Sequence, residues 1–142
     1  DHLDALVILP ATSPLRYQKD VDNALDLFEE GGCDAVISVK RASRNPYFNM
    51  TKINSKNFSE IVLKSDSNIF NRQNAPQIYD MATVVYVVSI NHLKKNNHLF
   101  EGLVKQIMIP EERAIDIDNN FDFEIAEILL KKNNYKIEDD QD

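Results

Sequence analysis

ALVILP at residues 5–10 decides the fold class, because five apolar residues in succession end at a proline. A short continuous run of this kind is typical of a strand that is buried on both faces of a parallel sheet. Ser13-Pro14 then supplies a helix-start signal, and apolar residues recur at helical spacing as far as Gly31-Gly32. A second apolar run at residues 35–39 completes the order strand, helix, strand, which predicts a right-handed βαβ crossover in an α/β sheet.

Beyond this unit the apolar pattern weakens, and polar residues predominate between positions 41 and 77. One short apolar segment at residues 60–63 predicts an edge or hairpin strand. A long loop without structure is unusual in a compact domain, so we expect an arm at residues 41–78 that packs on another surface, such as a second subunit. The later patterns predict strands at 83–88 and 106–109 and helices at 90–95 and 121–132.

Composition and charge narrow the class of protein. The 142 residues are 43% hydrophobic, which is ordinary for one globular domain, and we expect that domain at residues 1–137. The acidic end at 138–142 has too little apolar content to pack, so we expect a disordered tail there.

The net charge of -7 argues against a nucleic-acid partner. With one cysteine and no apolar run near the roughly 20 residues that cross a bilayer, we expect a soluble, cytoplasmic protein without a membrane partner.

Asp116-Ile117-Asp118 is the strongest local signal for chemistry, because two carboxylates stand two residues apart just before the last expected helix. In an extended segment such side chains point to the same side, and hard carboxylate oxygens suit Mg²⁺. The alternative is structural: Asp118 or one of the two asparagines after it caps the helix, while Asp116 is merely exposed. Spacing alone leaves both interpretations open.

A second signal is LPATSPLR at residues 9–16, directly after the first expected strand. Ligands of open α/β sheets generally bind outside the carboxyl ends of the strands, where this loop would lie. The structural alternative is that Ser13-Pro14 only starts a helix and Arg16 is a surface charge in its first turn. Arg72 in the arm is a weaker signal, since an isolated arginine in a polar loop is usually solvated.

Several short motifs follow one another in a defined order along the chain. They are Thr12-Ser13-Pro14-Leu15-Arg16, Asn45-Pro46-Tyr47, Arg72-Gln73, the strand with Tyr86, and Asp116-Ile117-Asp118 with Asp122-Phe123 and Ala126-Glu127 after it. In order and spacing they resemble the acylneuraminate cytidylyltransferase family, from about residue 5 to about residue 130. The resemblance implies an α/β fold, namely a partial nucleotide-diphospho-sugar transferase (Rossmann-like) three-layer sheet with a protruding dimerisation arm.

The resemblance also implies a reaction and the residues that serve it. Members of the family join CMP from CTP to a keto-sugar acid and release pyrophosphate, and a homodimer is expected. Asp116 and Asp118 stand where the family holds its catalytic Mg²⁺. Arg72 and Tyr86 correspond to positions that line the sugar-acid pocket, and Phe100, with Leu99 beside it, falls where a partner subunit forms the pocket wall. Arg16 belongs to the family's loop motif, where it is expected to fix the structure of the loop more than to touch the substrate.

This chain departs from the family pattern in two ways. The family opens with a strand and a loop rich in Gly, Lys and Arg that cradles the CTP phosphates, whereas the only glycines here are Gly31, Gly32 and Gly102. We therefore expect the chain to be the C-terminal two-thirds of such an enzyme, incomplete for catalysis alone. In addition, YDMAT at residues 79–83 looks more like members that act on legionaminate-type sugar acids than like those that act on N-acetylneuraminate.

Two other functions stay open on the sequence. The chain could be a non-catalytic remnant that serves as a dimerisation or binding module. It could also be a glycosyltransferase that uses Asp-x-Asp to hold a nucleotide-sugar. That class would place the carboxylates after a central strand and ahead of a much longer acceptor region, which this chain lacks.

Overall fold

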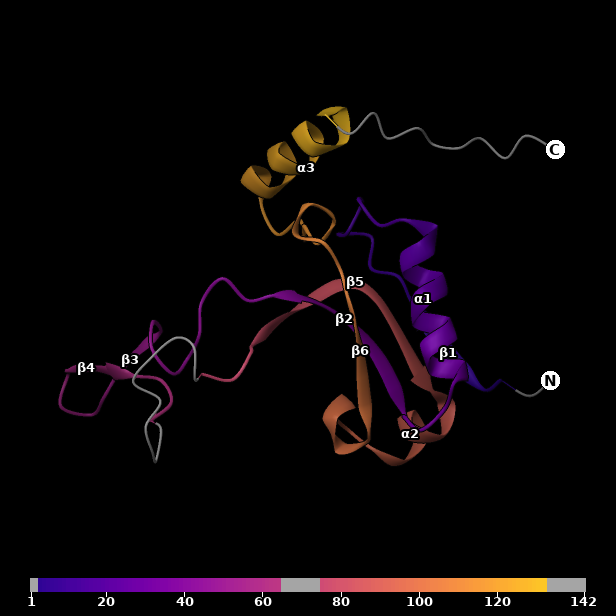
Figure 1. Cartoon of the computed structure of the whole chain (residues 1–142), viewed down its shortest axis with the longest axis horizontal. Coiled ribbons are helices and arrows are strands. Elements are labelled where there is room, and N and C mark those ends of the chain that lie inside the picture. Colours follow the sequence, from indigo (N-terminus) through magenta and orange to yellow (C-terminus); the bar gives the residue numbers. More distant parts are fainter. Residues whose placement is uncertain (1–2, 65–74, 133–142) are drawn as a thin grey trace. The chain divides into compact units, whose positions relative to one another are not determined.

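The computed structural model describes residues 3–64 and 75–132 (Figure 1). The chain divides into two compact units. The sheet unit comprises Asp1–Lys40 and Met81–Asp142, and the arm unit comprises Arg41–Asp80. The expected acidic tail at 138–142 and the expected site residue Arg72 lie outside the described residues.

Four strands form the sheet in the order β1-β5-β2-β6. Their bounds are Ala5–Ile8 for β1, Ala35–Arg41 for β2, Tyr79–Ser89 for β5 and Val104–Met108 for β6. The outer pair β1 and β5 is antiparallel, with Val7 opposite Val87, while β2 and β6 are parallel, with Ile37 opposite Gln106. The sheet is therefore mixed, and its two central strands, β5 and β2, carry most of the buried apolar residues.

The prediction that the first strand is buried in a parallel sheet is wrong for the described structure. β1 lies at the edge of the sheet, pairs antiparallel with β5, and leaves Leu6, Val7 and Ile8 exposed. An apolar run specifies a strand but carries no information on which strands become its neighbours. Because β5 is inserted between β1 and β2, the expected strand, helix, strand unit joins two strands that are not adjacent.

Helix α1 spans Gln18–Glu29 and begins later than the signal at Ser13-Pro14 predicted. Ser13 is fully buried instead, and its hydroxyl shares a 2.7 Å hydrogen bond with the hydroxyl of Thr83. The N-terminus of α1 is held by Asp20, whose carboxylate accepts a hydrogen bond from the Tyr17 N–H at 2.9 Å. At the other end the chain passes through Gly31 and Gly32, both with positive φ, which glycine adopts without steric cost.

The core of the sheet unit lies between α1 and the sheet. Val36, Val84, Val85 and Val87 are fully buried and pack with Ala24 of α1. Further α1 side chains cover the same cluster, namely Val21, Leu25, Leu27 and Phe28. This face of the sheet is therefore closed by the helix that the sequence pattern predicted (Figure 1).

The remaining helices lie close to their predicted positions. α2 spans Ile90–Lys95 and α3 spans Asn120–Lys132, and short 3₁₀ turns occupy Leu99–Glu101 (η2) and Glu111–Arg113 (η3). Among the described residues, no helix is both long and apolar enough to span a membrane.

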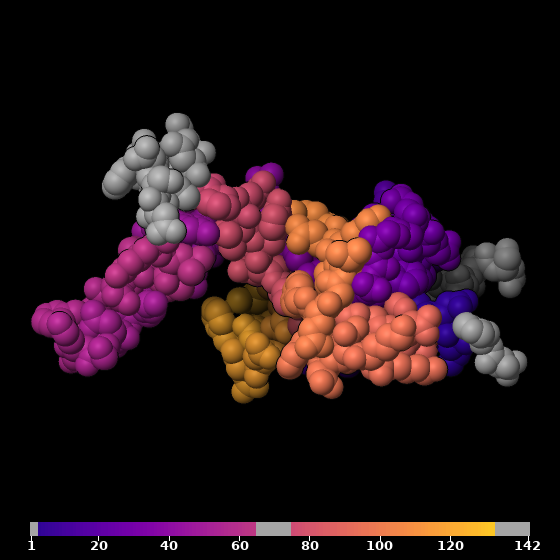
Figure 2. Space-filling model, turned by 90° about the horizontal axis from the view of Figure 1, so that it is seen from below, coloured from indigo at the N-terminus to yellow at the C-terminus, as the bar shows by residue number. Residues whose placement is uncertain are grey.

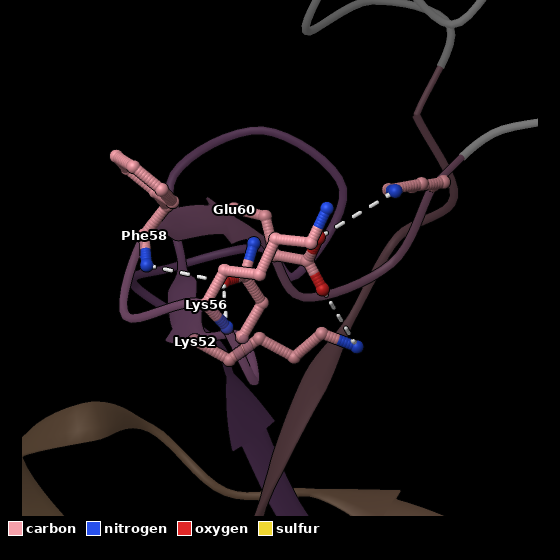
Figure 3. A network of polar contacts seen from close by, with 6 residues as sticks. Lys52, Lys56, Phe58 and Glu60 are labelled. Atoms are coloured by element: carbon pink, nitrogen blue, oxygen red, sulfur yellow. Dashed lines mark hydrogen bonds and ion pairs between the residues drawn. The ribbon is translucent and has the colours of Figure 1, made fainter.

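The arm unit contains a β-hairpin, which is one of the two interpretations of the apolar segment at residues 60–63. β3 (Thr51–Ile53) pairs antiparallel with β4 (Ser59–Ile61). Glu60 forms ion pairs with two lysines. Lys52 Nζ lies 3.6 Å from one carboxylate oxygen, as Figure 3 shows, and Lys64 Nζ lies 3.5 Å from the other. Exposed ion pairs of this kind contribute little to stability, so the hairpin depends mainly on its turn and strand pairing.

Candidate active site

Three segments of the sheet unit come together at one place. They are the loop after β1, the middle of β5, and the segment that leads into α3. The Ile117 N–H donates to the Thr12 carbonyl at 2.9 Å, and the Ser13 hydroxyl is bonded to Thr83 of β5. The tertiary structure thus brings the two strongest signals of the sequence, at residues 9–16 and 116–118, into direct contact.

Arg16 ties the loop to β5. Its guanidinium donates to the Val84 carbonyl at 2.8 Å and to the Pro10 carbonyl. Burial lowers the pKa of the Arg16 side chain from its ordinary value. These contacts are those of a residue that fixes the shape of the loop, and its contact with a substrate stays a prediction.

The cap of α3 leaves the Asp-x-Asp carboxylates free for other contacts. Asn119 Oδ1 accepts hydrogen bonds from the N–H groups of Phe121 and Asp122, at 2.9 and 3.1 Å. In return, Asp122 Oδ2 accepts from the N–H groups of Asp118 and Asn119, at 3.1 and 3.2 Å. These reciprocal hydrogen bonds satisfy backbone N–H groups at the N-terminus of α3. Capping by the side chain of Asn119, one of the two asparagines considered, is therefore observed.

Asp116 is the unusual member of the pair. One of its carboxylate oxygens, Oδ1, is buried and has no hydrogen-bond partner among the residues that the structure describes. Buried polar atoms are almost always bonded, and a lone buried carboxylate oxygen is costly unless a cation or donor meets it. Asp118 is exposed. A hard divalent cation fits this donor set, because Mg²⁺ typically takes one or two carboxylates and completes its shell with water and phosphate oxygens.

No group of three or more His, Cys, Asp or Glu side chains in the described part of the chain is arranged to hold a metal by itself.

Tyr86 on β5 lies within electrostatic reach of Asp116. The pKa of its phenol is raised from the ordinary value, first by burial and then by the negative charge of Asp116. The phenol therefore stays protonated at neutral pH and can donate a hydrogen bond. Two of the expected site residues, Asp116 and Tyr86, are thus brought together by the fold.

This proximity predicts a measurable shift. We expect the Asp116→Asn variant to lower the pKa of Tyr86, because the charge that opposes formation of a phenolate is removed while the burial remains. Phenolate absorbance can be titrated on the whole chain, and subtraction of a Tyr86→Phe variant separates this residue from the other tyrosines. An Asp22→Asn variant, which removes an exposed carboxylate on α1, serves as the matched control. An unchanged Tyr86 titration in Asp116→Asn would refute this electrostatic interaction.

Phe100 belongs to η2 and is 63% exposed. Leu99, its neighbour, lines a cavity on the α2 side of the sheet unit together with Tyr86. The predicted role of Phe100 in a partner's pocket needs an exposed ring, which it has, and stays a prediction.

Three residues that the sequence reasoning missed join the start of α1 to η3, the turn that precedes the Asp-x-Asp segment. Arg113 donates to both carboxylate oxygens of Asp20, with Nη2–Oδ1 at 2.6 Å and Nε–Oδ2 at 3.2 Å. Its guanidinium also lies over the ring of Tyr17, 4.5 Å from the centroid. Asp20 is only 2% exposed. The acidic residue in the first turn of α1 was visible in the sequence, but nothing linked it to an arginine 93 positions away.

No protein-family description matches the chain. Two curated relatives are each 32% identical to it over 136 residues, 96% of this chain. One is the post-translational flagellin modification protein B of Campylobacter coli, and the other is the CMP-N,N'-diacetyllegionaminic acid synthase of Campylobacter jejuni. The chain spans 57% of the length of each.

A solved structure, 4-diphosphocytidyl-2C-methyl-D-erythritol synthase from Anaerococcus prevotii, matches with a TM-score of 0.60. The match covers 90% of this chain and 59% of that one at 14% identity, so it bears on the fold alone. The relatives confirm the resemblance inferred from the ordered motifs, and this structure confirms the α/β fold class.

Proposed function

We propose that the chain forms part of an enzyme that transfers CMP from CTP to a keto-sugar acid and releases pyrophosphate, because it is 32% identical to a CMP-N,N'-diacetyllegionaminic acid synthase. The observation that carries the proposal is the buried, unpartnered oxygen of Asp116, held next to Tyr86 in a segment bonded to the loop after β1. The legionaminate-type substrate of the C. jejuni relative makes a nonulosonic acid the first candidate sugar.

Each expected residue has a definite part in this proposal. Asp116 and Asp118 hold Mg²⁺, which when bound supplies positive charge for the phosphate oxygens of CTP. The phenol of Tyr86 donates a hydrogen bond to an oxygen of the sugar acid. Arg16 keeps the loop against β5, and Arg72 pairs with the sugar carboxylate.

The partners of the enzyme follow from the same proposal. CTP and the keto-sugar acid are the substrates, and the arm unit, together with Phe100, forms the contact of a homodimer. Exposed apolar residues on the arm hairpin favour such a contact, since Ile53 and Phe58 are both largely exposed. We expect such a CTP-consuming enzyme to work in the cytoplasm.

The test uses a chimaera in which this chain replaces the matching region of the C. jejuni synthase. We expect Mg²⁺-dependent release of pyrophosphate from CTP in the presence of N,N'-diacetyllegionaminic acid, with N-acetylneuraminate as the comparison sugar. The unmodified C. jejuni synthase provides the positive control. A folded chimaera that releases no pyrophosphate with either sugar would overturn the proposed enzymatic activity and favour a role as a non-catalytic module.

A further inference from the structure

A buried ion pair joins the start of α1 to the turn that precedes the Asp-x-Asp segment. Asp20 is almost fully buried, and both of its carboxylate oxygens accept hydrogen bonds from Arg113 of η3. The Arg113 side chain is itself only 19% exposed. In Figure 2 the orange segment that contains η3 lies directly against the purple α1. The pair therefore ties together two parts of the sheet unit that are far apart in the sequence.

The geometry of this pair fixes orientation as well as distance. A guanidinium is a planar fork, so two of its N–H groups that meet both oxygens of one carboxylate also align the two planes. Asp20 is held in turn, because its Oδ2 accepts a hydrogen bond from the Tyr17 N–H at 2.9 Å. The guanidinium of Arg113 lies over the Tyr17 ring, 4.5 Å from its centroid. Arg113 thus has one defined place at the N-terminus of α1.

Stability by itself does not account for such a pair. Breaking a buried ion pair is costly, yet apolar side chains of similar volume in place of both partners are often equally stabilising or better. A bidentate pair adds something that apolar packing supplies less strictly, namely which groups meet and at what angle. The pair between Asp20 and Arg113 is therefore better explained by the segment that it positions.

Asp116 lies three residues after Arg113, in a segment that has a second attachment directly beyond it. The Ile117 N–H donates to the Thr12 carbonyl at 2.9 Å. The first attachment leads to the first turn of α1, and the second leads to the loop that comes just before that helix. The backbone that carries Asp116 is thus fixed on both sides to one neighbouring stretch of chain.

The carboxylate of Asp116 depends on this backbone for its position. Its Oδ1 is buried and has no hydrogen-bond partner within the described ranges, so no hydrogen bond at this oxygen orients the group. Residues outside the ligand shell of a metal usually supply that orientation, and their loss weakens metal binding. For Asp116 the attachments on either side of it are the available means.

We propose that Arg113, anchored by Asp20 and Tyr17, is a positioning residue that holds the carboxylate of Asp116 in place for Mg²⁺. The inference rests on the proposed function, in which Asp116 is a metal ligand. Arg113 acts through the backbone of residues 113–117 and not by contact with the cation. Its loss should therefore loosen the Asp-x-Asp segment before it affects the rest of the sheet unit.

Amide hydrogen exchange, read residue by residue with NMR, tests this positioning on the chain alone, without metal or activity. The double variant Asp20→Asn with Arg113→Met leaves no buried charge unpaired, so it should remain folded. We expect exchange at the Ile117 N–H to become about tenfold faster or more, because its segment loses one of two attachments. The Ile109 N–H donates to the Val39 carbonyl at 2.8 Å, before η3, and is the internal control.

The internal control separates local loosening from a general loss of stability. If exchange at Ile117 and Ile109 accelerates by the same factor, the pair only stabilises the fold, and the proposal is overturned. Lys19→Met removes an exposed charge next to Asp20 in the sequence and is the matched control. It should leave exchange at Ile117 unchanged.

A lysine at position 113 separates charge from geometry. Arg113→Lys keeps the positive charge beside Asp20 but lacks the planar fork that meets both carboxylate oxygens. We expect exchange at Ile117 in this variant to lie between that of the unmodified chain and that of the double variant. Full protection of Ile117 in Arg113→Lys would contradict a role for the bidentate contact.

The active chimaera gives an independent measurement. There the double variant should raise the Mg²⁺ concentration for half-maximal rate by about tenfold, as is usual when a group that orients a metal ligand is lost. Since Asp116 itself is retained, saturating Mg²⁺ should restore most of kcat. An unchanged Mg²⁺ requirement would overturn the role of Arg113 toward the cation. An inactive chimaera with faster exchange at Ile117 would reject the enzyme and keep the positioning, while an active one with unchanged exchange would do the reverse.

Discussion

Replacing Arg113 with methionine is expected to lower the free energy of unfolding of the chain by about 3 kcal/mol, because it leaves the carboxylate of Asp20 buried without its charged partner. Asp20 is almost fully buried and bonds to Arg113 through both oxygens. For a chain of this size the loss corresponds to a melting temperature lower by about 10 °C, measured by circular dichroism or calorimetry.

Two further variants identify the cause of this loss. Lys19→Met removes an exposed charge next to Asp20 in the sequence and should change the stability by less than about 0.5 kcal/mol. In the double variant Asp20→Asn with Arg113→Met, no buried charge remains, so part of the stability should return. A loss below about 1 kcal/mol in Arg113→Met alone would show that the pair is too hydrated to matter.

Replacing Asp116 with asparagine in the active chimaera is expected to lower kcat by about a thousandfold, since charge stabilisation of several kcal/mol is lost and each 1.4 kcal/mol is about tenfold in rate. The side chain keeps its size, so the buried position should remain filled. The measurement is pyrophosphate release at saturating CTP across a series of Mg²⁺ concentrations. The apparent requirement for Mg²⁺ should also rise.

Asp22→Asn is the matched control for this prediction, because it removes a carboxylate that is exposed on α1, and it should leave both kcat and the Mg²⁺ requirement unchanged. Asp118→Asn should behave like Asp116→Asn but with a smaller effect, since Asp118 is exposed. Activity that survives replacement of both aspartates by alanine would reject the proposed metal ligands.

Much of the fold could be predicted because its signals are local. The buried run at residues 35–39, the helix at 90–95 and the helix at 121–132 reappear as β2, α2 and α3 with little change in their bounds. Hydrophobic periodicity and chain-breaking residues act over a few positions, so one sequence is enough to locate such elements. The ordered motifs likewise predicted the family that the two relatives support.

The start of α1 and the place of β1 could not be predicted in the same way. Ser13 has the residue type of a helix cap, yet its hydroxyl is used by Thr83, 70 positions away. A competing tertiary hydrogen bond therefore overrode a local preference that is worth about 1 kcal/mol. Similarly, the apolar run of β1 predicted a strand correctly but not an edge position beside an antiparallel β5.

The sequence alone determined most strands and helices of the sheet unit, and the residue types of the candidate site, namely the Asp116 and Asp118 pair and the loop with Arg16. Only the tertiary structure decided which of them meet. In that structure Ile117 is hydrogen-bonded to Thr12, and Asp116 lies near Tyr86. Asp20 pairs with Arg113, and β1 lies at the edge of the described sheet. The physical reason is that propensity and periodicity act between near neighbours in the chain, whereas these contacts join segments whose approach depends on how the whole core packs.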